Sequence, residues 1–140
     1  VGIDPVLDAP YRYIDSVLSR EAGRYDFSVL DFHAEATGEK IATASYYDGR
    51  INIIFGTHTH VPTADLTILP GGTGYVTDVG MCGASGGILG MRRDTVIRRI
   101  VTKVPEPFMP AEGECYADGV IFTLSEANGR VTDLQRVLIK

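Results

Sequence analysis

The sequence has few of the residues that define special protein classes. It lacks tryptophan and holds only two cysteines, Cys82 and Cys115, which are far apart and form no Cys-x-x-Cys pair. Two isolated cysteines make neither a disulfide framework nor a zinc ribbon, so we expect free thiols in a reducing compartment. No apolar run approaches the roughly 18 residues of a membrane span, and no secretory signal is visible. We therefore expect a cytoplasmic protein with no membrane partner.

Positive charge is also scarce. Asp and Glu outnumber Lys and Arg by 18 to 13, which gives a formal net charge of −5. Binding of nucleic acid over a broad surface needs clustered Lys and Arg, so we expect no extended nucleic-acid surface. The main basic cluster has helical spacing and is typical of a solvated helix face. It comprises Arg92, Arg93, Arg98, Arg99 and Lys103.

Apolar periodicity predicts alternating helices and strands, hence a layered α/β (α+β) fold. The expected helices run from Pro10, after an N-cap at Asp8, to Gly23, from Glu35 to Gly49 and from Asp94 to Val101. The expected strands are 26–32, 51–55, 65–69, 75–79, 120–124 and 131–139, with a hairpin at Asn128-Gly129 and a glycine-rich loop over 80–90. The first of these strands is short and apolar, which predicts burial on both faces. The 140 residues form one domain, or the C-terminal half of a larger one, without an internal boundary.

All three histidines of the chain follow expected strands. His33 comes after the apolar run Phe27–Phe32, and His58 and His60 come after Ile51–Phe55, with Gly56 allowing a sharp turn. α/β folds build their sites at strand ends, and imidazole is the commonest metal ligand, suited to Zn, Fe, Mn or Ni. The pattern predicts a metal site. Three imidazoles alone could hold one metal ion, whereas a binuclear hydrolytic site also needs carboxylates.

Two acidic residues are candidates for the surroundings of this site. Asp31 lies two residues before His33 on the same strand face, where it could orient an imidazole. Asp78 interrupts the apolar run Tyr75–Val79, which makes it a stronger candidate than the remaining acids. The other acids, Glu35, Glu39 and Asp65, are explained equally well by capping or exposure to solvent. The glycine-rich segments 71–74 and 83–87 match no phosphate-binding motif and are expected to be turns.

Four segments, in order along the chain, resemble the YmdB-like metallophosphoesterases, which are calcineurin-type phosphodiesterases acting on 2′,3′-cyclic nucleotides. They are Asp31–Thr37 (DFHAEAT), Gly56–Asp65 (GTHTHVPTAD), Leu69–Thr73 (LPGGT) and Thr77–Met81 (TDVGM). The resemblance covers nearly the whole of this chain, but it corresponds to only the C-terminal half of the proteins in that family. The other half normally contributes an Asp, a bridging acid, Asn ligands and a histidine general acid, and none of those motifs is found here.

The resemblance implies the C-terminal part of a metallophosphoesterase-type αββα sandwich with a binuclear centre at its strand ends. His33 and His58 match ligands of one divalent metal and His60 matches a ligand of the other, both being Fe, Mn or Zn. Asp31, Thr59 and Asp78 are expected around these ligands or on the substrate side. The complete enzyme would hydrolyse cyclic nucleotides, or related small phosphodiesters, by a metal-activated hydroxide.

The same resemblance sets expectations for this chain alone. Half a site should bind at most one metal ion weakly, and we expect no activity without the missing N-terminal half, which supplies the general acid. Strand edges left open by that half predict a homo-oligomer or association with the half itself. Two other hypotheses are a non-catalytic metal- or phosphate-binding module and a structural domain with packed histidines.

Overall fold

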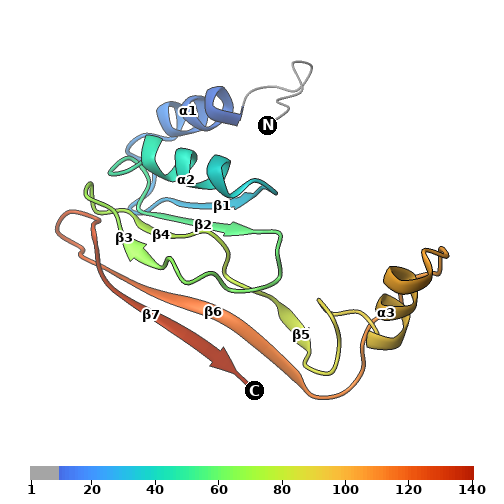
Figure 1. Ribbon diagram of the computed structural model, residues 1–140. Helices are drawn as coiled ribbons and strands as arrows, with labels where there is room; N and C mark the ends of the chain where they lie inside the picture. The colour runs from blue at the N-terminus through green and yellow to red at the C-terminus, as the bar shows by residue number, and fades with distance from the viewer. Residues whose placement is uncertain (1–9) are drawn as a thin grey trace.

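The structure is a computed structural model that describes residues 10–140, so the expected N-cap at Asp8 lies outside the described residues. The described chain forms helices and strands that build two sheets (Figure 1). In chain order the elements are α1 (Pro10–Arg20), β1 (Val29–His33), α2 (Thr37–Tyr46), β2 (Ile53–Thr57), β3 (Thr67–Ile68), β4 (Gly74–Val76), β5 (Cys82–Ala84), α3 (Arg93–Thr102), β6 (Cys115–Leu124) and β7 (Val131–Ile139).

The two sheets and two of the helices form three layers. The larger sheet has the order β1-β2-β4-β3, in which β1, β2 and β4 are parallel and β3 is antiparallel. Helices α1 and α2 cover one face, and the antiparallel sheet β5-β6-β7 lies on the other side (Figure 1). The sheets pack closely, because a Cβ at Gly74 in β4 would lie 2.6 Å from Phe122 and 3.0 Å from Val131. This arrangement confirms the layered α/β prediction.

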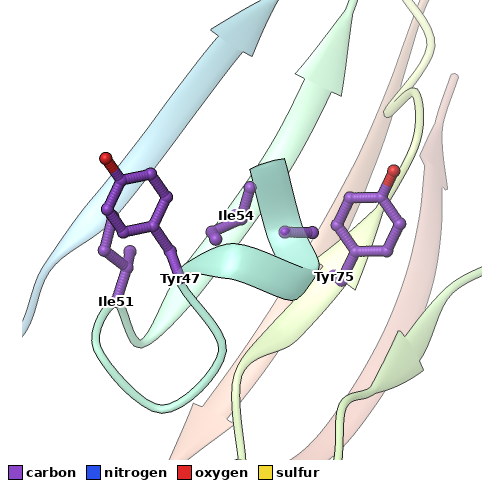
Figure 2. Close-up of a cluster of buried hydrophobic side chains, with 5 residues drawn as sticks. Tyr47, Ile51, Ile54 and Tyr75 are labelled. Carbon is purple, nitrogen blue, oxygen red and sulfur yellow. The ribbon is translucent and has the colours of Figure 1, made fainter. Parts of the chain in front are cut away.

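The core lies between the helical layer and the larger sheet. It is a cluster of buried side chains around Tyr47, Ile51, Ile54 and Tyr75, completed by Ala44 (Figure 2). Apolar residues of α1 pack against this cluster at helical spacing, as the sequence predicted. The Tyr47 hydroxyl donates a hydrogen bond of 3.0 Å to the Tyr11 carbonyl, and burial raises its pKa to about 12. The polar tip of the largest core residue is therefore satisfied and neutral.

Three local predictions around the histidines are wrong. Strand β1 is not buried on both faces: its residues alternate between exposed and half-buried, and Val29 is 59% exposed. Among the described residues, β1 is the outermost strand of its sheet. Gly56 lies within β2 and makes no turn, and the left-handed backbone angles fall instead on His58 (φ 136°) and His60 (φ 63°). Glu35 precedes α2, whose first turn contains Glu39.

The glycine-rich segment after β4 also differs from the prediction. Residues 80–90 were expected to be a loop, but Cys82–Ala84 form β5, which pairs with the start of β6. Backbone pairing does not require apolar periodicity, so the pattern gave no signal for this strand. Helix α3 follows and lies at the far end of β5 and β6, away from α1 and α2 (Figure 1). Among residues 10–140, every helix is too short or too polar to cross a membrane.

Candidate metal centre

Strands β1 and β2 end side by side and bring two histidines together. In the parallel register His33 is paired with Thr57, the residue directly before His58. The Nε2 atom of His33 lies 3.4 Å from the Nδ1 atom of His58, and the ring centroids are 5.2 Å apart. The two rings therefore present nitrogen atoms to a single point beyond the strand ends.

Thr57 fixes the orientation of the His33 ring. Its hydroxyl donates a hydrogen bond of 3.3 Å to Asp31 Oδ1, and its Oγ1 lies 3.0 Å from His33 Nδ1. Because the hydroxyl proton goes to the carboxylate, the Thr57 oxygen accepts the N–H of His33 Nδ1. With the proton on Nδ1, the other ring nitrogen, Nε2, faces His58 Nδ1. Asp31 thus acts on His33 through Thr57 and not directly.

The third histidine borders the same cavity but has a different partner. His60 Nδ1 lies 3.3 Å from the Leu89 carbonyl oxygen, to which it donates. The three histidines line one cavity of about 840 Å³, whose lining also includes Met81, Met91, Pro110 and Glu112. Within residues 10–140, no three His, Cys, Asp or Glu side chains are arranged to hold one metal ion. The structure pairs His33 with His58 and places His60 elsewhere in the cavity wall.

Asp78 lies beneath the turn that carries His58 and His60. It is fully buried, its Oδ2 accepts the N–H of Thr59 at 2.7 Å, and its Oδ1 accepts the N–H of Gly80 at 3.0 Å. The ammonium of Lys40 lies 3.5 Å from the same Oδ2. Burial opposes ionisation, but these N–H donors and the ammonium outweigh it and hold the pKa of Asp78 below its usual value. The carboxylate is therefore charged where it anchors the histidine turn.

Asp65 has a structural role away from the histidines. It accepts hydrogen bonds from the Thr63 hydroxyl at 2.6 Å and from the backbone N–H of Thr77 at 3.2 Å. Burial alone would raise the pKa of Asp65, but these bonds lower it. Asp65 thereby ties the segment after His60 to the segment after β4, and it caps none of the described helices.

Sequence reasoning missed Thr57 and Lys40. Thr57 meets His33 only through the register of two parallel strands, which no local pattern specifies. Lys40 gave no signal because a single lysine on a helix is ordinarily exposed, whereas here its exposed fraction is 1%.

The histidines lie in one cavity at the carboxyl ends of parallel strands, where α/β proteins commonly place their functional sites. The protein is therefore a layered α/β protein with a candidate metal centre. Residues 1–137 match the model of the YmdB-like protein family, and the chain belongs to this family. It is 46% identical, over 96% of its length, to the 2′,3′-cyclic-nucleotide 2′-phosphodiesterase of Bacillus subtilis (strain 168).

Two solved structures resemble the chain closely. A hypothetical protein from Thermus thermophilus superposes with a TM-score of 0.85 at 41% identity, covering 97% of this chain and 52% of the other. A novel phosphatase from Mycoplasma pneumoniae superposes with a TM-score of 0.87 at 34% identity, covering 99% and 49%. These neighbours support the metallophosphoesterase-type fold that the motifs implied. The chain spans about half the length of the relatives it matches, including 51% of the Bacillus subtilis protein.

Proposed function

We propose that the protein hydrolyses phosphodiester bonds, with 2′,3′-cyclic nucleotides as the substrate class, at a centre of divalent metal ions. The observation that carries this proposal is the 3.4 Å separation between His33 Nε2 and His58 Nδ1. Two nitrogen ligands that lie about 2.0–2.1 Å from one tetrahedral metal ion are about 3.4 Å from each other. The pair of rings fits the group that the family implies.

The three histidines of this chain would bind two different metal ions. His33 and His58 would bind one divalent ion of Fe, Mn or Zn, and His60 would contribute to a second. Such ions, when bound, polarise phosphoryl oxygens and lower the pKa of water. Asp31 and Thr57 keep the proton of His33 on Nδ1, so that Nε2 remains a ligand. A bridging carboxylate and a general acid would come from the half of the fold outside this chain.

Turnover of a 2′,3′-cyclic nucleotide tests the proposal. The 140-residue chain with Mn²⁺ or Fe²⁺ should show only the background rate. Fusion to the upstream half of the Bacillus subtilis relative should raise the rate by about 10³-fold or more, since removal of essential catalytic groups commonly costs that much. His58→Ala in the fusion should return the rate to background. Metal binding without turnover in the fusion would favour a non-catalytic module, and no metal binding in either protein would favour a structural domain.

The orientation of His33 gives a smaller, sharper prediction. Thr57→Val removes the hydroxyl that receives the His33 N–H while keeping the shape of the side chain. Metal affinity should fall about 10-fold or more, as it does when other residues that orient a metal-binding histidine are removed. Calorimetric titration with Zn²⁺ would measure the loss. Thr57→Ser, which keeps the hydroxyl, should bind as tightly as the wild type, and equal loss in both variants would contradict the assignment.

We further propose that β1 binds the half of the fold that the relatives carry outside the region matched here. Among residues 10–140, the outer edge of β1 has no partner strand. The strand begins at Val29 and follows Phe27, which are 59% and 42% exposed. An apolar cavity of about 350 Å³ between α1 and this edge is lined in part by Tyr13, Val17 and Leu18. An unpaired strand edge beside exposed apolar side chains favours pairing with another chain. Because the chain spans about half of its relatives, the upstream half is the partner we propose, with self-association in its absence.

Light scattering tests this association. We expect the chain alone to form oligomers at high concentration and to form a one-to-one complex when the upstream half is added. Val29→Lys at the edge should weaken both, since a lysine on an edge strand opposes pairing. Val101→Lys, at an exposed site on α3, is the matched control and should change neither. A monomer at all concentrations that ignores the added half would refute the proposal.

A further inference from the structure

The backbone of the histidine turn adopts angles that its residues do not favour. His58 and His60 both have positive φ, at 136° and 63°, in a region that glycine occupies readily and other residues rarely do. Such angles persist only where surrounding contacts impose them, and they are common at functional sites. The contacts that impose them here must act on residues 58 to 60.

Those contacts converge on one buried residue, Asp78, through its carboxylate and its backbone. Thr59, the residue between the histidines, donates its backbone N–H to Asp78 Oδ2 at 2.7 Å. The Thr63 N–H donates to the Asp78 carbonyl at 3.1 Å, and the Asp78 N–H donates to Thr63 Oγ1 at 2.9 Å. Asp78 therefore holds both the middle of the turn and the segment that leaves it.

The carboxylate is in turn held from the helical layer. Lys40, in the first turns of α2, reaches the Asp78 side chain, and the exposed fractions of the two side chains are 1% and 0%. The Lys40 stem crosses β2 at Gly56, where an added Cβ would lie 2.8 Å from its Cδ. Asp78 is the hydrogen-bond partner of the ammonium among the described residues. A buried charge of this kind needs a partner of opposite charge, so each residue fixes the other.

We infer that the buried Lys40–Asp78 pair is a positioning device that fixes the histidine turn, and through it the approach of His58 to His33. Neither residue touches the cavity, so both act through the backbone of Thr59. The inference rests on the proposed function only in taking the histidines as metal ligands. It goes beyond that function by assigning a role to Lys40, and by placing the control of ligand geometry in α2.

The test uses the 140-residue protein and Co²⁺ alone as the probe. Lys40→Met together with Asp78→Asn removes both charges while nearly keeping both shapes, and circular dichroism would establish that the double variant folds. We expect its Co²⁺ affinity to fall about 10-fold or more and its visible absorption spectrum to change. Thr43→Val, at a fully buried site on the same helix, is the matched control and should keep both properties. A folded double variant with wild-type affinity and spectrum would overturn the inference.

Amide hydrogen exchange gives a second readout that needs no metal. The Thr59 N–H should be protected in the wild type and should exchange about 10-fold faster in the folded double variant, because an amide oxygen accepts more weakly than a carboxylate. If the wild type binds no Co²⁺, the proposed metal centre fails, while the exchange of Thr59 still decides the role of the pair. If the double variant does not fold, hydrogen exchange in the wild type still tests the inference. A protected Thr59 amide would support the inference, and an unprotected one would refute it.

Discussion

Replacing Gly56 with alanine is expected to destabilise the protein by about 3 kcal/mol or more, at or above the upper end of ordinary overpacking. A Cβ at this position would lie 1.9 Å from the carbonyl oxygen of Thr77 and 2.8 Å from Lys40 Cδ. The first of these atoms belongs to the backbone of the neighbouring strand segment and cannot move aside cheaply. Strand β2 would have to separate from that segment, and His58 would move with it.

Gly38 provides the matched control for this substitution. It lies in α2, and a Cβ added there would meet no atom within 4 Å. Gly38→Ala should therefore stabilise the helix by about 0.5–1 kcal/mol, the usual difference between the two residues in a helix. Urea unfolding followed by circular dichroism would measure both variants. A Gly56→Ala protein as stable as the wild type would mean that β2 does not approach Thr77 as closely as described.

Removal of one member of the Lys40–Asp78 pair is expected to have the second large effect. Lys40→Met or Asp78→Asn alone leaves an unpaired buried group, and breaking a buried pair in this way costs about 3–5 kcal/mol. The double variant loses the pair without leaving a lone charge, so its stability should lie close to that of the wild type. The expected coupling free energy between the two sites is therefore large, and its sign is opposite to that of the stability lost in each single variant.

Denaturant unfolding of the two single variants and the double variant would measure this coupling. Asp133→Asn serves as the control, because Asp133 is an exposed residue of β7 in the other sheet. Its effect should add to that of Lys40→Met without coupling. Additive losses in the Lys40–Asp78 cycle would show that the two charges do not depend on each other.

The sequence predicted the features of the fold that depend on apolar periodicity and on turn-forming residues. Helix α1 followed from apolar residues at helical spacing, and the last hairpin followed from the Asn128-Gly129 signal. The expected burial of β1 was wrong because an apolar run shows that a strand is suited to burial, not that a neighbour is present to bury it. Strand β5 was missed because a glycine-rich segment has no periodicity, although its backbone can still pair.

The candidate site divides in the same way. The histidines could be found because their residue type is rare here and each follows an apolar run. The partners that orient them could not, since Thr57 reaches His33 only through strand register and Lys40 reaches Asp78 from another layer. The positive φ of His58 and His60 had no sequence signal at all, because the expected turn residue was Gly56.

The histidine cavity is shared between the two sheets. The histidines extend from the larger sheet, whereas Cys82 belongs to β5, Cys115 to β6 and Met81 to the segment that leads into β5. The width of the cavity therefore depends on how the two sheets pack against each other. Gly74 contributes to this packing, because it lies against Phe122 and Val131. The side chains proposed to bind metal and the side chains that close the other side of the cavity thus belong to separate layers of the fold.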